Sequence, residues 1–294
     1  MLDEYEVREA LCEVGRRVWT RNYIASNDGN LSFRLDENRV LCTPTMISKG
    51  FMKPDDMVIM DLQGNQLAGA RKATSEAKIH LYIYQQRPDV HSVVHVHPPH
   101  ATAFAIARRE LPKCVLPEIE LFLGEIPLAP YATTGTWEFA RTIEPWVRNH
   151  DCFLLTNHGA VTVGQDPFDA YYKMETLDQY CRILLLAKQI GDWNTINIEG
   201  IRDLLNLKQK MGVADPRTNC EPCNAGAQAS TTMKTPGYFQ VHPGPMVDAP
   251  KLGPVHKEQP MQSQAPQQRS PQNADVNLNA IVEEVVRRVL RNNS

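Results

Sequence analysis

Two histidines separated by one residue lie within residues 93–98, which read Val-Val-His-Val-His-Pro. The run predicts a buried strand, and because strand side chains alternate between faces, His95 and His97 would point to the same side. Pro98 favours an extended conformation for His97 and ends the strand. Two neighbouring imidazoles on a rigid strand are half of a metal site. The spacing alone fits equally well two core or surface histidines.

A catalytic zinc site needs a third protein ligand and an open position. Outside the proline-rich part of the chain, the candidates are His80, His91, His100, His150 and His158. His158 is the best placed, because Asn157-His158-Gly159 predicts a tight turn that exposes it, and Gly159 allows close approach of the backbone to a ligand. Taken alone, His158 is read more simply as a hydrogen-bonded turn histidine.

Glu76 follows two hydroxyl residues, Thr74 and Ser75, where a helix is predicted to begin. A carboxylate there suits a general base beside an anion-binding helix N-terminus. Spacing alone favours the simpler interpretation, a carboxylate stabilised by the helix dipole.

Alternating helices and strands would position these residues. Amphipathic patterns predict helices at about 3–22, 74–87, 101–107, 136–148, 167–190 and 198–211. Strands are predicted at 31–34, 39–43, 58–61, 93–97, 152–156 and 160–163. Residues 44–48 are expected to form a loop, and 121–124 and 126–129 a strand or a loop.

Composition excludes several classes of protein. A net charge of −3 gives no electrostatic case for nucleic acid or for an anionic membrane, and no apolar run is long enough to span a bilayer. Seven cysteines without framework spacing favour a reducing compartment, and the acidic first residues do not resemble a signal peptide. We therefore expect a cytoplasmic protein.

Composition divides the chain into three parts. Residues 1–212 carry the periodic patterns, whereas 213–272 are rich in proline and glutamine and predict a flexible linker. Within 273–294, residues 276–291 place an apolar stripe opposite charged residues, which predicts a short amphipathic helix that docks on a partner, on its own domain or on another copy. Cys220 and Cys223, a lone C-x-x-C in the linker, are read as an incidental pair rather than a metal or redox site.

Five motifs in this order resemble the class II aldolase/adducin family, most closely its L-fuculose-phosphate aldolases. They are Gly29-Asn30-Leu31-Ser32, Thr43-Pro44-Thr45, Thr74-Ser75-Glu76 with His80, His95-Val96-His97-Pro98, and Asn157-His158-Gly159. The resemblance covers about residues 3–212. It implies a three-layer α/β/α fold with a central, mainly antiparallel sheet, and a homotetramer with active sites between subunits.

The resemblance also implies a role for each matching position. His95, His97 and His158 would bind one zinc per subunit, and Glu76 would be the catalytic acid/base, lying on the metal when substrate is absent. The substrate phosphate would be held by Gly29, Asn30, Thr45, Met46, Thr74 and Ser75.

The implied reaction is zinc-dependent cleavage of a 6-deoxy-ketose 1-phosphate, L-fuculose 1-phosphate or L-rhamnulose 1-phosphate, to dihydroxyacetone phosphate and lactaldehyde. Zinc would stabilise the enediolate that forms when the bond breaks. The alternatives within the family are an L-ribulose-5-phosphate 4-epimerase, a methylthio-sugar-phosphate dehydratase and an adducin-like binding protein. Epimerases tend to carry aspartate at the position of Glu76, and adducin-like members have lost the metal ligands.

This sequence departs from the family pattern at two positions. Met46 stands where family aldolases often have glycine. The tyrosine that a neighbouring subunit uses to protonate the aldehyde oxygen would fall at Leu116, so Glu118 and Tyr131 become the candidates for the acid.

The order of domain, linker and terminal amphipathic helix resembles enzymes targeted to bacterial microcompartments. That resemblance implies that residues 276–291 act as an encapsulation peptide that binds shell proteins. The enzyme would then work in the microcompartment lumen, where a shell confines its reactive aldehyde product.

Overall fold

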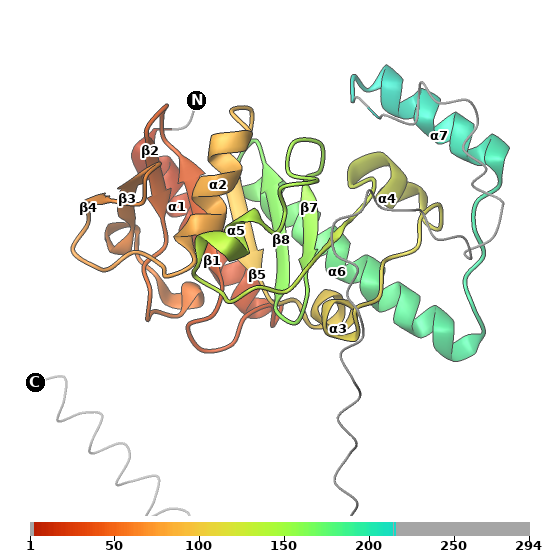
Figure 1. The fold of residues 1–294 in the computed structure, drawn as a ribbon, viewed down its shortest axis with the longest axis horizontal. Helices are drawn as coiled ribbons and strands as arrows, with labels where there is room; N and C mark the ends of the chain where they lie inside the picture. The colour runs from red at the N-terminus through yellow and green to blue at the C-terminus, as the bar shows by residue number, and fades with distance from the viewer. Residues whose placement is uncertain (1–2, 214, 216–294) are drawn as a thin grey trace, which may run out of the picture. The chain divides into compact units, whose positions relative to one another are not determined.

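The computed structural model describes residues 3–213 and 215, which form one sheet with helices on both faces (Figure 1). Apart from residues 213 and 215, the predicted linker at 213–272 and terminal segment at 273–294 lie outside the described residues, as do Cys220 and Cys223.

The strands are β1 (Asn30–Arg34), β2 (Arg39–Cys42), β3 (Val58–Asp61), β4 (Gln66–Ala68), β5 (Ser92–Val96), β6 (Leu128–Ala129), β7 (Cys152–Leu155) and β8 (Gly159–Gly164). The helices are α1 (Glu4–Thr20), α2 (Ala77–Gln86), α3 (Pro99–Ala107), α4 (Pro117–Phe122), α5 (Trp137–Arg141), α6 (Pro167–Ile190) and α7 (Ile198–Lys210). Two 3-10 turns, η1 (Lys49–Phe51) and η2 (Pro54–Asp56), follow β2.

The strand order is β4-β3-β2-β1-β5-β8-β7-β6, and only β6 and β7 pair in parallel. The α/β class with a mainly antiparallel central sheet is therefore confirmed. Strand β5 lies in the middle, where His95 is opposite Asn30 of β1 and Val161 of β8. This register brings the segments around residues 29 and 158 to either side of the predicted histidine strand.

Alternating strand residues supply two hydrophobic cores, one on each face of the sheet. Val94 and Val96 pack with α1, α3 and α6, whereas Val93 packs with α2 and α5 on the opposite face. Figure 1 shows α2 and α5 in front of the sheet, with α1 behind it. The sheet is thus the middle of three layers.

Two predicted elements differ from the structure, and one strand was not predicted. Residues 121 and 122, expected to belong to a strand or a loop, lie instead in helix α4. This helix forms because Pro117 occupies its first turn and the Glu120 carboxylate accepts a hydrogen bond from the Cys114 amide. Helix α5 ends at Arg141, where a longer helix to 148 was expected, and the remainder is a series of turns. The exposed edge strand β4 carries no apolar alternation and was not predicted.

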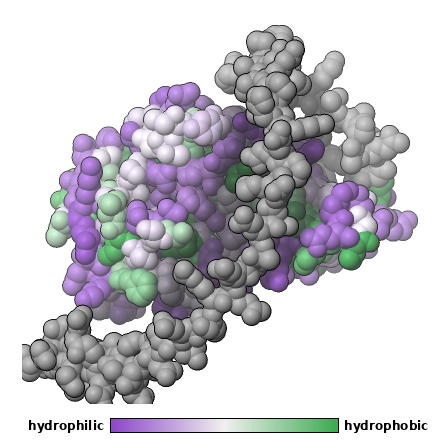
Figure 2. All heavy atoms as spheres, turned by 90° about the horizontal axis from the view of Figure 1, so that it is seen from below, coloured by the Kyte–Doolittle hydropathy of each residue, from purple (hydrophilic) through white to green (hydrophobic). Residues whose placement is uncertain are grey.

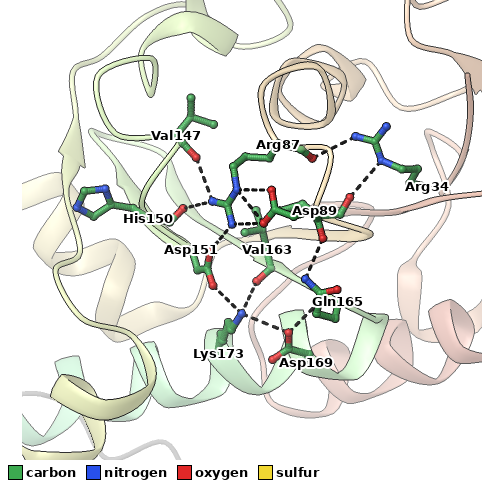
Figure 3. A network of polar contacts seen from close by, with 11 residues as sticks. Arg34, Arg87, Asp89, Val147, His150, Asp151, Val163, Gln165, Asp169 and Lys173 are labelled. Atoms are coloured by element: carbon green, nitrogen blue, oxygen red, sulfur yellow. Dashed lines mark hydrogen bonds and ion pairs between the residues drawn. The ribbon is translucent and has the colours of Figure 1, made fainter. Parts of the chain in front are cut away.

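A network of charged groups joins four elements of the fold (Figure 3). Arg87, at the end of α2, donates to Asp89 and Asp151 and to the carbonyl oxygens of Val147 and His150. Lys173 of α6 donates to Asp151, Asp169 and the carbonyl of Val163. These contacts connect the end of α2 to β7, β8 and α6.

In the described part of the chain, no helix is long and apolar enough to cross a membrane. On the face drawn in Figure 2, hydrophilic residues predominate on the left of the view, with hydrophobic residues in small groups among them.

Candidate active site

Three imidazole rings meet at the end of β5. The ring centroids of His95 and His97 are 5.3 Å apart, those of His95 and His158 4.7 Å, and those of His97 and His158 4.9 Å. One potential ligand atom from each residue lies within 4.8 Å of the others. The predicted pair on the strand and the predicted turn histidine are thus brought together.

The backbone positions each of the three histidines. His95 Nδ1 donates to the carbonyl of Ala160 at 2.9 Å, so Nε2 is the ring nitrogen left to bind a metal ion. The amide of His97, one residue beyond β5, donates to the carbonyl of Tyr23 at 2.9 Å. His158 follows Asn157, whose left-handed backbone (φ 58°) makes the tight turn between β7 and β8.

Gly159 begins β8 directly against His97. A Cβ atom at Gly159 would lie 2.6 Å from both the His97 ring and the carbonyl oxygen of Val96. The glycine is required because no larger residue fits between the two strands without displacing His97.

Glu76 completes the cluster from α2. Its Oε2 atom lies 3.3 Å from His95 Nε2 and its Oε1 atom 3.3 Å from His158 Nε2. The side-chain amide of Asn30 donates to Oε2 at 2.9 Å. Burial raises the pKa of Glu76, but the histidines and Asn30 outweigh it and hold the pKa well below its usual range, so the carboxylate is ionised.

The start of α2 differs from the prediction. Glu76 itself is the N-cap residue, and its side chain makes no cap hydrogen bond, while the Thr74 hydroxyl accepts a hydrogen bond from the Glu76 amide at 3.4 Å. The Glu76 carboxylate is turned to the histidines instead of to the backbone of its own helix.

The donor set fits a divalent metal ion. The Nε2 atoms of His95 and His97 and the Nδ1 atom of His158 are buried, and no described residue hydrogen-bonds to them. Burial, together with the neighbouring histidines, lowers the pKa values of His97 and His158 to about 4, so both are neutral, as metal ligands must be. Burial acts to lower the pKa of His95, but the hydrogen bond and charge of Glu76 outweigh it and raise that pKa instead. Three imidazoles with an adjacent carboxylate suit zinc and similar first-row cations.

A polar pocket of about 190 Å³ adjoins this cluster. Its walls come from the loop after α1, the loop after β2 and the N-terminus of α2. The lining residues are Asn27, Asp28, Gly29, Asn30, Thr45, Lys49, Thr74, Ser75, Glu76 and His97. Hydroxyl groups and a helix N-terminus in one small cavity suit a phosphate group.

Five of the six residues predicted to bind phosphate line this pocket. Met46 does not, and this residue is 79% exposed. Its backbone is left-handed (φ 58°), a conformation that favours glycine. This geometry explains why glycine suits the position.

Lys49 is the residue that sequence reasoning missed. Its side chain is only 1% exposed, and its ammonium donates to the carbonyl oxygens of Asn27 at 2.7 Å and Ile47 at 2.8 Å. Burial lowers its pKa to about 8, although Asp28 and Glu76 act to raise it. In the sequence, Lys49 is simply a lysine that follows Thr45 by four residues. Nothing in that pattern distinguishes it from an ordinary surface lysine.

The two candidates for the acid are exposed residues of this chain. Glu118 is exposed on α4, and Tyr131 is 60% exposed after β6. Leu116 is the N-cap residue of α4, partly buried against the core. Neither Glu118 nor Tyr131 lines the pocket within this single chain.

The other histidines considered as third ligands have separate environments. His80 is buried against Asn30 and Ser32, and His100 contacts Asp178. His150 pairs with the carbonyl of Trp146, and the ring of His91 lies beside Phe33.

Residues 9–185 match the family model of the class II aldolase and adducin N-terminal domain. The chain belongs to this family. An L-fuculose phosphate aldolase of Methanococcus maripaludis is 37% identical over 171 residues, which are 58% of this chain and 92% of that protein. A 3-oxo-tetronate 4-phosphate decarboxylase of Haemophilus influenzae is 32% identical over 180 residues, covering 60% of this chain and 85% of the relative.

The fold agrees with these relatives. The structure of an L-fuculose 1-phosphate aldolase superposes with a TM-score of 0.64 at 29% identity, covering 69% of this chain and 96% of the other. A lyase of the class II aldolase superfamily, aldolase-like or decarboxylase-like, is the activity class that the family match supports.

Proposed function

We propose that this protein is a zinc-dependent aldolase that cleaves a 6-deoxy-ketose 1-phosphate, of the L-fuculose or L-rhamnulose type, to dihydroxyacetone phosphate and lactaldehyde. One observation carries the proposal. The Glu76 carboxylate contacts His95 and His158 and also lines the pocket suited to phosphate. A single carboxylate therefore stands between a metal-type donor set and a phosphate-type cradle.

The residues of this chain would divide the work as follows. Gly29, Thr45, Thr74 and Ser75 would hold the phosphate, which fixes the distance from phosphate to the reacting carbons. A divalent cation held by the three histidines would act as a Lewis acid toward the enediolate. When the C3–C4 bond breaks, its electron pair moves toward the C2 carbonyl. The proton of the C4 hydroxyl would pass to the acid/base group expected from a neighbouring subunit as the aldehyde forms. Glu76, after taking up a proton from solvent, would deliver it to C3, which completes dihydroxyacetone phosphate.

A decarboxylase is the second candidate. Loss of the carboxylate of a 3-oxo-tetronate 4-phosphate as CO₂ leaves the same three-carbon enediolate, so the same phosphate pocket and Glu76 would serve. Retro-aldol cleavage requires a group that takes the proton of the C4 hydroxyl, whereas a substrate carboxylate is already deprotonated. Leu116, at the position expected for the tyrosine, favours this alternative, as does the decarboxylase relative.

An assay of products separates the two candidates. The full-length protein, loaded with zinc, would be incubated with a panel of ketose 1-phosphates and 3-oxo-tetronate 4-phosphates. Dihydroxyacetone phosphate with an equal amount of lactaldehyde supports the aldolase. Dihydroxyacetone phosphate with CO₂ supports the decarboxylase, and no dihydroxyacetone phosphate from any substrate contradicts both.

The assembly and location belong to the same proposal. We expect one zinc per subunit and a homotetramer, in which Glu118 or Tyr131 of a neighbouring subunit supplies the acid missing at Leu116. We also expect residues 276–291 to bind microcompartment shell proteins. The chemical reason is that a shell would retain the reactive aldehyde.

A further inference from the structure

Four buried side chains lie in a row behind Glu76. Asn30 donates to Glu76 Oε2 at 2.9 Å, and Asn30 Oδ1 lies 2.5 Å from His80 Nε2. His80 Nδ1 is 2.7 Å from Ser32 Oγ, which is 2.8 Å from the Tyr84 hydroxyl. All four side chains are at most 2% exposed. The row is therefore shielded from water along its length.

The row forms because two regular elements face each other. Asn30 and Ser32 alternate on β1 and so share one face of the strand. Glu76, His80 and Tyr84 follow at intervals of four residues along α2, on one face of the helix. The contacts therefore connect β1 to α2, and the row ends at the Glu76 carboxylate.

The chemistry of each group fixes the direction of every hydrogen bond in the row. An ionised Glu76 only accepts, so Asn30 presents its NH₂ group to Glu76 and its oxygen to His80. The Nε2 atom of His80 must then carry the proton, which leaves Nδ1 as an acceptor. Ser32 donates to that nitrogen and accepts from Tyr84. Every donor thus points toward Glu76.

Because His80 is buried, only the ring with its proton on Nε2 satisfies its hydrogen-bond partners. The pKa of His80 is lowered to about 3, chiefly by burial and in part by His95, so the ring is neutral and carries one proton. If that proton moved to Nδ1, Nε2 would accept, and the amide of Asn30 would have to turn over. Its oxygen would then face the Glu76 carboxylate, and two acceptors would oppose each other.

We propose that Tyr84, Ser32 and His80 are positioning residues that act through Asn30 to fix the orientation of the Glu76 carboxylate. They do not reach the pocket themselves, because none of the three lines it. The catalytic part of the inference rests on the proposed function, in which Glu76 moves the proton of the enediolate. The hydrogen-bond direction does not depend on that function.

Two serine substitutions provide a matched test. Ser32→Ala removes the donor to His80, whereas Ser92→Ala removes an equally buried hydroxyl that donates to the backbone carbonyl of Ser32. Both serines lie on paired strands and lose the same atom. Tyr84→Phe is a milder change, because Ser32 keeps its hydrogen for His80.

The first readout is solvent deuterium exchange into dihydroxyacetone phosphate by the full-length, metal-loaded protein. Ser32→Ala is expected to slow the maximal exchange rate about tenfold with a KM within about twofold of the wild type. Tyr84→Phe should lose less, and Ser92→Ala should match the wild type. Equal losses in the two serine variants at equal melting temperatures would overturn the positioning role.

The second readout needs no turnover, so it separates this inference from the proposed function. Nitrogen-15 NMR of protein labelled at histidine reports which ring nitrogen carries the proton, and the signal of His80 is identified by its loss in His80→Gln. We expect an Nε2–H ring in the wild type and in Ser92→Ala, and an altered ring in Ser32→Ala. An Nδ1–H ring in the wild type, or no change in Ser32→Ala, would contradict the proposed direction. If the wild type shows no exchange with any divalent cation, the proposed function fails, and the NMR result decides the network alone.

Discussion

The residues at the candidate site combine groups that the sequence presents far apart. His95 and His97 were predictable because a two-residue spacing in a strand is a local pattern. His158 was predictable because a tight turn is also a local pattern. The burial of Lys49 was not predictable, since it depends on carbonyl groups of Asn27 and Ile47 that only the folded loops bring to its ammonium. The missing cap at Glu76 has the same cause, because His95 and His158 lie far along the chain.

We expect His158→Ala to lower the affinity for zinc at least about a hundredfold and to remove catalytic activity with it, because a ligand of the cluster is lost. Metal content after dialysis, measured by atomic emission, checks this. His91→Ala is the control, since His91 lies outside the cluster, and it should retain metal. Full zinc content in the His158 variant would remove that histidine from the ligand set.

Lys49→Met should raise the KM for a phosphorylated substrate about tenfold or more, because the pocket loses the ammonium that favours an anion. In the wild type, the KM should rise as the pH passes about 8, where the pKa of Lys49 lies. In the variant, that rise should flatten. Steady-state kinetics between pH 7 and about 9.5 would measure both effects.

Folding stability should increase over the pH range in which the affinity for substrate falls. The pKa of Lys49 is lowered from 10.5 in the unfolded chain to about 8 in the folded protein. Between these values the unfolded state binds more protons, so the stability of the wild type relative to Lys49→Met rises with pH. Below about pH 8 the difference is constant. Urea denaturation measures the difference in free energy of unfolding between the wild type and Lys49→Met. If that difference falls as the pH rises, the burial of an ionisable Lys49 is contradicted.

At the scale of elements, the central strand β5 and the β7–β8 hairpin were predicted from valine alternation and from a glycine turn. Helix α4 was not, because a six-residue helix has too few positions to show a period, and it depends on the contact between Glu120 and the Cys114 amide. The early end of α5 was missed for a related reason. Residues 142–148, which continue the chain after α5, have apolar residues at helical intervals but form turns that pack on the core.

The charged network of Figure 3 makes its own prediction at this scale. Arg87→Ala should lower the free energy of unfolding by about 2 kcal/mol or more, because two carbonyl groups and Asp151 lose their donor at the end of α2. Urea denaturation measures the loss. Arg148→Ala, which removes one exposed contact to Gln86, should cost at most about 0.5 kcal/mol. Zinc content should be unchanged in both, since neither arginine contacts the cluster.

For the molecule as a whole, the sequence separates the family domain from the residues that follow it. The family match at residues 9–185 lies within the predicted domain at 1–212. Proline and glutamine content marked the following segment, but composition does not say what the terminal amphipathic pattern binds. That question is one of partners, and it needs an experiment on the full chain.

Deleting residues 273–294 should leave the turnover of purified enzyme unchanged and remove its co-purification with microcompartment shells. The reason is that the apolar stripe at 276–291 lies outside the residues assigned to the site. A control deletion of equal length within 240–261 should retain co-purification. Retention of the 273–294 deletion in shells would contradict the targeting proposal.

The two edge strands of the sheet affect how the protein behaves at high concentration. The edge strands are β4, with three residues, and β6, with two. Such short edges expose few unpaired backbone amides and carbonyls, so they offer little template for another chain to add a strand. A protein packed at high local concentration is at risk of edge-to-edge aggregation. The short edge strands of this sheet protect the protein from such aggregation, and this protection requires no charged group and no ligand.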